Sequence, residues 1–143
     1  LKAISLISLG LAVLGMVFLL INENLLSLNP FGIFIQICSA GLMIWARITF
    51  GIRSFHASAN TTKGKLVTNR PYRWLRHPIY AAIIYFAWAG VLSQPNINAF
   101  IAVGIITAGL IARMIIEEKF LMSYYSDYKT YSEKTVRLIP FLF

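Results

Sequence analysis

Two short polar stretches in this otherwise apolar chain carry residue types that could bind and position a charged ligand. In the first, Arg76 and His77 stand directly before Pro78, and proline favours the first turn of a helix because its missing N–H is not needed there. The start of a helix presents free main-chain N–H groups and a partial positive charge. Together with Arg76, these groups would favour an anionic group such as a carboxylate or a phosphate.

In the second stretch, Arg113 and Glu117 are four residues apart, so their side chains share one face of a helix. Arg113 directly follows an apolar run, at or just inside a membrane surface, where ionisable residues are costly and often functional. Glu118 points about 100° away from Glu117, so the two need not share a role. If the two stretches meet, they form a polar pocket that would suit a charged cofactor together with a lipophilic substrate. The residues predicted to line this pocket are Arg76, His77, Tyr80, Arg113 and Glu117.

The same residues also have purely structural interpretations. Basic and aromatic residues beside an apolar segment, such as Arg70 and Trp74, are typical of positive-inside anchors and of an interfacial aromatic belt. A structural hydrogen bond would account for His77. A surface ion pair worth roughly a few tenths of a kcal/mol would account for Arg113 and Glu117.

The composition places these stretches in a membrane protein. Hydrophobic residues make up 58% of the 143 residues and charged residues 13%, whereas a soluble domain is about half apolar and about a quarter charged. The mean hydropathy is +0.70 and the pI is about 9.9. The net charge of +8 comes from basic residues that flank apolar segments, so anionic lipid and membrane topology explain it better than nucleic acid does. The one cysteine, Cys38, cannot form an intramolecular disulfide, and we expect no metal site.

Four apolar segments predict an all-α integral membrane protein with a single domain. The first has about 19 residues, close to the ~20 that cross the hydrocarbon, whereas the third and fourth are short for full spans at about 15 residues each. We predict two N-terminal transmembrane helices in 1–50, a cytoplasmic loop in 51–78, a helical hairpin in 79–116 and a cytoplasmic C-terminal tail in 117–143.

The distribution of lysine and arginine predicts the orientation. Residues 47–76 hold seven basic and no acidic residues, and residues 113–137 hold five basic residues. The connections at 22–30 and 93–98 hold no lysine or arginine. Both termini and the central loop should therefore face the cytoplasm. The two polar stretches flank the helical hairpin, so they should meet in space. The expected architecture has about four transmembrane helices and a cytoplasmic-face cofactor pocket formed by the last two helices and the tail.

The tail contains several tyrosines. Tyr124, Tyr128 and Tyr131 lie at helical spacing on one face, which predicts an amphipathic helix lying on the lipid headgroups. The apolar run at 137–143 could return to the membrane as a small cap.

The polar stretches read "KLVTNRPYRWLRHPIY" and "RMIIEEKFLMSYYSDYKTYSEKTVRLIP". They contain, in order, Leu-Val, Pro-Tyr, Arg-His-Pro-x-Tyr, Arg-x-x-x-Glu-Glu, Tyr-x-x-Tyr and a closing Ile-Pro. This arrangement resembles the isoprenylcysteine carboxyl methyltransferase family and, more distantly, the phospholipid methyltransferases. The resemblance covers about 64–140, and the order and spacing are specific although each piece alone is not. It implies a methyltransferase that uses S-adenosylmethionine, is built inside the membrane and opens to the cytoplasm.

The resemblance also implies roles for individual residues. Arg113 would face the substrate, and we assign Arg113 and Arg76 as catalytic. The predicted cofactor-binding residues are Gly64, Lys65, Leu66, Val67, Tyr72, His77, Pro78, Ile79, Tyr80 and Glu117. Two positions depart from the family pattern, because Arg70 and Ala82 stand where many members have glycine.

Methyl transfer is an in-line displacement on a sulfonium and needs positioning more than acid or base. The cofactor carboxylate could be bound by His77 and by main-chain N–H groups at the start of the third segment, and its ammonium or ribose diol by Glu117. An arginine clamp would orient a substrate carboxylate. An amine would need deprotonation, and the base candidates are limited to Glu118 and His77. The sequence therefore favours a carboxylate or thiolate nucleophile on a lipophilic or membrane-embedded acceptor.

Two other functions are left open. A nicotinamide-dependent membrane reductase of the sterol-reductase type has a similar C-terminal layout, but that family tends to carry Asn where this chain has Ile79. A non-enzymatic four-helix membrane protein would bind no small molecule through Arg113 and Glu117. The small chain suggests a prokaryotic inner-membrane protein. Its expected partners are membrane lipids and a lipophilic small-molecule or lipid-modified substrate, and not nucleic acid.

Overall fold

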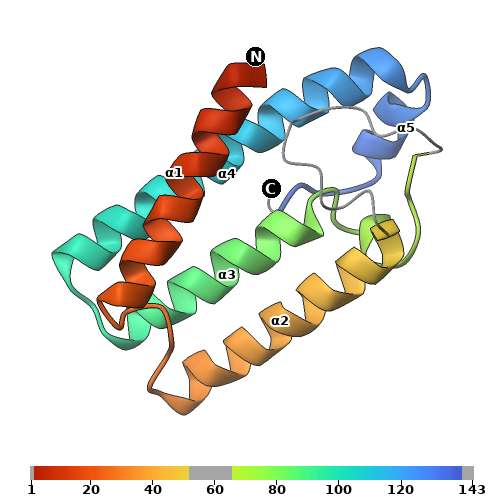
Figure 1. The fold of residues 1–143 in the computed structure, drawn as a ribbon. Coiled ribbons are helices and arrows are strands. Elements are labelled where there is room, and N and C mark those ends of the chain that lie inside the picture. The colour runs from red at the N-terminus through yellow and green to blue at the C-terminus, as the bar shows by residue number, and fades with distance from the viewer. Residues whose placement is uncertain (1, 52–65, 140–143) are drawn as a thin grey trace.

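The computed structural model describes residues 2–51 and 66–139, and all regular elements within these ranges are helical (Figure 1). The elements are α1 (Lys2–Ile21), α2 (Pro30–Phe50), the short 3-10 helix η2 (Arg70–Arg73), α3 (Pro78–Ser93), α4 (Ile97–Tyr124) and α5 (Tyr128–Glu133). Three helices, α1, α2 and α4, are long and apolar enough to cross a membrane. The fourth, α3, is apolar but has 16 residues and a length of only ~24 Å. These findings confirm the all-α integral membrane class.

Local sequence explains where the helices begin. Asn29 caps α2, because its side chain accepts a hydrogen bond from the Gly32 N–H at 2.6 Å, and Asn96 caps α4 in the same way. Pro78 is the first residue of α3, as its fixed φ predicts. His77, at the N-cap of α3, makes no capping hydrogen bond with its side chain. The imidazole ring of His77 is therefore directed elsewhere.

The helices pack side by side in the order α1, α4, α3, α2, and each neighbouring pair is antiparallel (Figure 1). The α1–α4 contact is close because both helices present small residues. A Cβ atom at Gly109 would lie only 2.9 Å from the Ser8 carbonyl oxygen. Ser5, Ser8 and Ala12 are all buried on α1. Such small residues allow membrane helices to approach each other through their backbones.

The connection between α1 and α2 closes the end of the bundle that lies away from α5. It lies against α3 at Gly90, where a Cβ atom would lie 2.2 Å from the Leu25 carbonyl oxygen. Gln36 holds the connection in place, since its side chain accepts from the Ser27 N–H at 3.0 Å and donates to the carbonyl oxygens of Leu25 and Phe86 at 2.7 and 3.1 Å. The nitrogen and the oxygen of the buried Gln36 amide are thus both hydrogen-bonded, as buried polar groups usually are.

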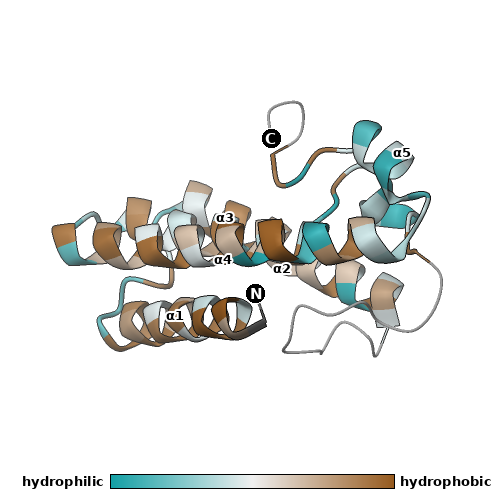
Figure 2. Ribbon diagram, turned by 90° about the horizontal axis from the view of Figure 1, so that it is seen from above, coloured by the Kyte–Doolittle hydropathy of each residue, from teal (hydrophilic) through white to brown (hydrophobic). Residues whose placement is uncertain are grey.

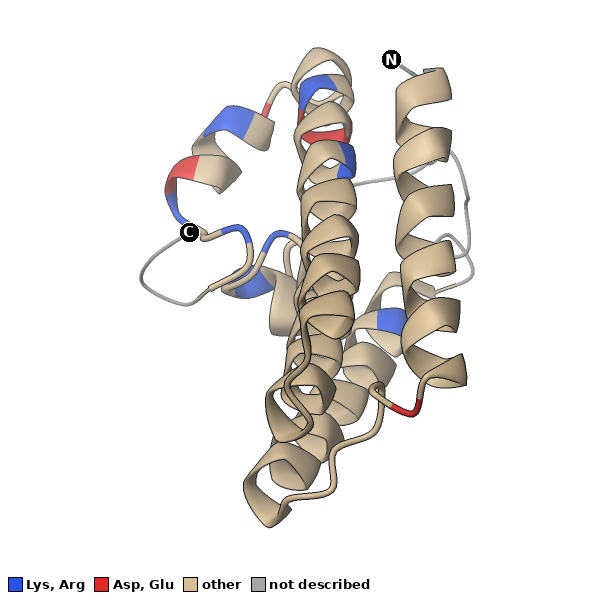
Figure 3. Ribbon diagram, turned by 90° about the vertical axis from the view of Figure 1, so that its left-hand side faces the viewer, with Lys and Arg blue, Asp and Glu red and all other residues tan. Residues whose placement is uncertain are grey.

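Polar residues concentrate at the opposite end. Hydrophilic residues gather on α5 and on the neighbouring end of α4, whereas α1 is largely hydrophobic (Figure 2). Acidic and basic residues gather on the same end of α4, on α5 and on the segments around them (Figure 3). The polar end of the molecule therefore lies where α4 leaves its apolar stretch.

The tail differs from the single amphipathic helix that the tyrosine spacing predicted. α4 ends at Tyr124, and α5 begins at Tyr128 after a turn. Tyr124 is exposed, Tyr128 is fully buried, and the Tyr131 hydroxyl donates to the Tyr72 carbonyl oxygen at 2.6 Å. The prediction of one lipid-facing tyrosine face was wrong, because the turn directs Tyr128 and Tyr131 into the protein. The predicted return to the membrane falls mainly on 140–143, outside the described residues.

Candidate active site

The two polar stretches lie side by side, as predicted. Leu75 and Val136 form a parallel bridge between the segment before α3 and the tail. The Arg76 N–H donates to the Val136 carbonyl oxygen at 2.8 Å, and the His77 N–H donates to the Arg137 carbonyl oxygen at 3.2 Å. The tail thus fixes the main chain at the residues that lead into α3.

Arg113 lies at the centre of a polar cluster formed by α1, α3 and α4. Its Nε donates to the Tyr80 hydroxyl oxygen at 2.7 Å, and its Nη1 donates to the carbonyl and hydroxyl oxygens of Ser5 at 3.3 and 3.2 Å. Its Nη2 lies 3.3 Å from Glu117 Oε1, the same oxygen to which the Tyr80 hydroxyl donates at 2.6 Å. Arg113 is only 3% exposed. The Arg113–Glu117 contact is therefore part of a partly buried network and not an ordinary surface ion pair.

Among the described residues, no side chain donates a hydrogen bond to the second oxygen of Glu117, Oε2. His77 Nδ1 lies 4.0 Å from it, beyond hydrogen-bonding distance. The His77 ring stacks on the Tyr80 ring with centroids 5.6 Å apart and an interplanar angle of 11°. Its Nε2 lies 3.3 Å from Glu118 Oε1. This part of the site thus combines a carboxylate oxygen with an imidazole–phenol stack, which suits an ammonium or a hydroxyl group.

A second cluster, here called the tail latch, joins Arg76, Glu118 and Arg137. Arg76 Nε donates to Glu118 Oε1 and Arg137 Nε donates to Glu118 Oε2, both at 3.0 Å. Glu118 is 4% exposed. Arg76 Nη1 also donates to the carbonyl oxygens of Ser132 and Thr135, the latter at 2.7 Å. In the structure Arg76 therefore supports the tail, and its catalytic assignment stays a prediction.

The other predicted cofactor-binding residues lie in varied surroundings. Gly64 and Lys65 fall outside the described residues. Leu66, Val67 and Ile79 are half-buried, and Pro78 is fully buried at the start of α3. These six assignments stay predictions that follow from the family resemblance.

Tyr72 is buried against α2. Its ring packs on Phe50 with centroids 5.5 Å apart, and its hydroxyl lies 3.5 Å from the Ala46 carbonyl oxygen. Burial raises the pKa of the Tyr72 phenol, and burial likewise raises the pKa of Tyr131 to about 12. Both phenols are therefore neutral at physiological pH. Nothing in these contacts joins Tyr72 to the Arg113 cluster, so its cofactor role also stays a prediction.

Sequence reasoning missed three residues of these clusters. Ser5 lies outside the recognised motifs. The sequence feature that could have indicated it is the pair of polar residues Ser5 and Ser8 within the apolar first segment. Glu118 was named only as a candidate base for an amine acceptor. Arg137 was counted only toward the membrane orientation, because its partner is 19 positions away in the sequence.

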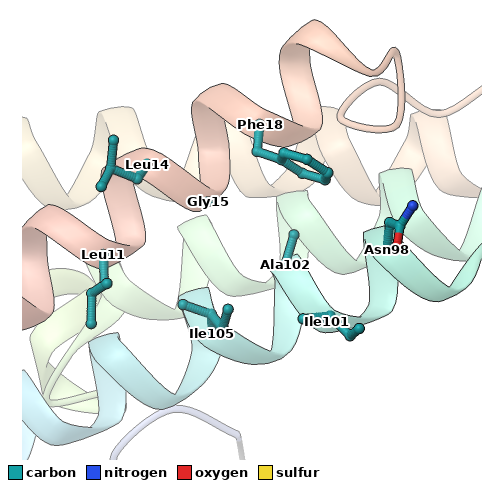
Figure 4. Close-up of a pocket in the computed structure, with 8 residues that line it drawn as sticks. All are labelled: Leu11, Leu14, Gly15, Phe18, Asn98, Ile101, Ala102 and Ile105. Carbon is teal, nitrogen blue, oxygen red and sulfur yellow. The ribbon is translucent and has the colours of Figure 1, made fainter.

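An apolar groove lies between α1 and α4, away from the polar cluster (Figure 4). It has a volume of about 360 Å³ and is lined by Leu11, Leu14, Gly15, Phe18, Asn98, Ile101, Ala102 and Ile105. Its nearest lining residue on α4, Ile105, is eight positions from Arg113, or ~12 Å along the helix axis. The groove is thus a separate, lipid-facing feature.

Antiparallel apolar helices with a partly buried arginine–tyrosine–glutamate cluster at one end define an integral membrane protein with a candidate small-molecule site. The chain belongs to the phospholipid methyltransferase family, whose family model matches residues 28–128, more than half of the chain. This family is part of the isoprenylcysteine/phospholipid methyltransferase superfamily, so the resemblance seen in the sequence is confirmed. No curated protein and no solved structure matches the chain. The matched region spans α2 to the first residue of α5 and excludes α1, which supplies Ser5 to the cluster.

Proposed function

We propose that this protein transfers a methyl group from S-adenosylmethionine to a lipophilic or membrane-embedded acceptor. Membership of the family implies a methyltransferase that acts on membrane lipids. The observation that carries the proposal is the partly buried cluster of Arg113, Tyr80 and Glu117, placed where apolar helices meet the polar end. This position would let a water-soluble cofactor and a lipid meet at one point.

The side chains of the site fit the polar groups of S-adenosylmethionine. Glu117 Oε2 has no hydrogen-bond donor from the described residues and could accept from the ammonium or from a ribose hydroxyl. The first turn of α3 is not capped by the His77 side chain, so its main-chain N–H groups suit the carboxylate. The cofactor would supply an electrophilic methyl group on a sulfonium. The residues of this chain bind and orient the two reactants.

Arg113 is proposed to orient an anionic group of the acceptor. In the structure its charge is balanced by Glu117 at 3.3 Å. A cofactor ammonium bound to Glu117 would compete for that carboxylate and so favour an anionic group of the acceptor beside Arg113. Binding of the cofactor would thereby favour binding of the acceptor.

The proposed nucleophile is a carboxylate or a thiolate, because the site offers little free base. Both oxygens of Glu118 accept from arginine, and one oxygen of Glu117 is held by Tyr80 and Arg113. A nucleophile that arrives already ionised needs no proton acceptor. A lipid amine is the second candidate, since action of the family on membrane lipids favours the amine headgroups that phospholipids commonly carry.

Family membership favours methyl transfer over the nicotinamide-dependent reduction that the sequence left open. We further propose that the site faces the cytoplasm, supported by the basic residues around it. Ser5 and Arg137 both lie at the polar end of the molecule, which supports placing both on one side of the membrane.

Isothermal titration of detergent-purified protein with S-adenosylmethionine tests the proposal. We expect saturable binding by the wild type, a large loss in Glu117→Ala, and no change in Glu133→Ala, which removes an exposed glutamate from α5. Transfer of labelled methyl to membrane lipids then identifies the nucleophile, because a methyl ester releases methanol in base whereas an N-methyl or thioether product does not. A folded wild type that fails to bind would contradict the proposal, and a nicotinamide dinucleotide titration would test the alternative.

A further inference from the structure

The hydroxyl group of Tyr128 is buried without a hydrogen-bond partner. Tyr128 is 1% exposed, and its hydroxyl is the buried side-chain polar atom for which the described residues supply no partner. Leaving such a group unsatisfied costs free energy, so native structures rarely do so without a reason. The neighbouring Tyr131, by contrast, donates its hydroxyl to a carbonyl oxygen.

The α5 segment that carries Tyr128 lies beside the candidate active site, because Arg76 donates to the carbonyl oxygens of Ser132 and Thr135. Burial is the main cause that raises the pKa of the Tyr128 phenol, followed by the charge of Glu118, with Glu117 also raising it and Arg76 opposing them. The phenol therefore remains protonated and can donate. Its ring packs edge-on against the Tyr131 ring with centroids 5.8 Å apart. A buried hydroxyl with no acceptor among the described residues thus lies beside Tyr131, whose own hydroxyl donates to the Tyr72 carbonyl oxygen.

We propose that the Tyr128 hydroxyl donates a hydrogen bond to an acceptor atom of the bound cofactor. The inference rests on the proposed function and adds a binding residue to it. The described residues supply no acceptor for this hydroxyl, so a bound ligand is the partner that we infer. Glu118 is bound by Arg76 and Arg137, and the Tyr131 hydroxyl is bound to Tyr72. S-adenosylmethionine carries carboxylate, ribose and ring-nitrogen acceptors that suit such a donor.

Two phenylalanine variants separate a binding role from a structural one. Tyr128→Phe removes one oxygen and leaves the ring, so the unliganded protein should melt at the same temperature as the wild type or higher. Its dissociation constant for S-adenosylmethionine should rise roughly tenfold in a calorimetric titration. Tyr131→Phe is the matched control, because it removes a hydroxyl that already has a protein partner. It should melt at a lower temperature and keep its dissociation constant within roughly twofold.

The outcomes distinguish the inference from the function on which it rests. Unchanged affinity in Tyr128→Phe, beside a wild type that binds, overturns the inference alone. A fall in melting temperature in Tyr128→Phe as large as that in Tyr131→Phe also overturns it, since the hydroxyl would then have a partner in the unliganded protein. Absence of binding by a folded wild type would overturn the proposed function and the inference together.

Discussion

Replacing Glu118 by glutamine tests whether the tail latch holds the polar end together. The substitution keeps the size of the side chain and removes the charge that Arg76 and Arg137 share. Removing one partner from a buried ion pair typically costs about 3–5 kcal/mol, because the other charge is left buried. Since the glutamine oxygen can still accept a hydrogen bond, we expect the Arg76 contact to contribute about 3 kcal/mol, near the lower limit.

The Arg137 contact should contribute less. The Arg137 side chain is 35% exposed, whereas those of Arg76 and Glu118 are 9% and 5% exposed. An exposed ion pair is worth about 0–1 kcal/mol, because water already solvates the charge. Glu118→Gln should therefore lower the free energy of unfolding by about 3–4 kcal/mol. Arg76→Met should lower the free energy of unfolding clearly more than Arg137→Met does.

Unfolding of the detergent-solubilised protein by added denaturing detergent, followed by circular dichroism, measures these differences. Glu133→Gln is the control, because it makes the same chemical change at an exposed position on α5. A loss below about 1 kcal/mol in Glu118→Gln, the value of an exposed pair, would refute the reasoning. Equal costs for Arg76→Met and Arg137→Met would show that burial does not rank the two contacts.

Three further predictions concern other parts of the fold. Ser5→Ala removes the hydroxyl that Arg113 contacts and should lower activity by roughly fivefold, the value of a hydrogen bond of about 1 kcal/mol, whereas Ser8→Ala on the same helix should leave the rate of methyl transfer nearly unchanged. Arg70 has φ of 54°, in the left-handed region, so Arg70→Gly should stabilise the protein by about 0.5–1 kcal/mol in the same unfolding assay, and Arg70→Ala should not. Gly90→Ala adds a Cβ atom 2.2 Å from a carbonyl oxygen of the α1–α2 connection and should lower the melting temperature by several degrees, and an unchanged value would contradict that close packing.

The main features of the site could be predicted from the sequence, because local signals carried them. Pro78 marked the start of α3, and the i, i+4 spacing placed Arg113 and Glu117 on one face of α4. The hairpin between them then brought His77 and Tyr80 from the first stretch beside them. The glycine preference of the family at position 70 also has a physical explanation, since that residue adopts a positive φ.

What the sequence could not predict depends on contacts between distant residues. Glu118 is 42 positions from Arg76, and Ser5 is 108 positions from Arg113, so periodicity holds no information about either pair. The turn between α4 and α5 contains no glycine or proline to mark it, and the tyrosine spacing therefore looked like a continuous helix. Only the packing of the tail against the segment before α3 shows that Tyr128 faces inward.

The bridge between Leu75 and Val136 has a consequence for biosynthesis. During translation α1 emerges before α2, α3 and α4, and the segment with Val136 and Arg137 emerges only after all four apolar helices. Until then Arg76 lacks its carbonyl acceptors in the tail and Glu118 lacks one of its two arginines. Insertion into the bilayer and completion of the polar end are therefore separate events in time. The polar end can therefore form only after the segment with Val136 and Arg137 has been synthesised, when the four apolar helices can already be in the membrane.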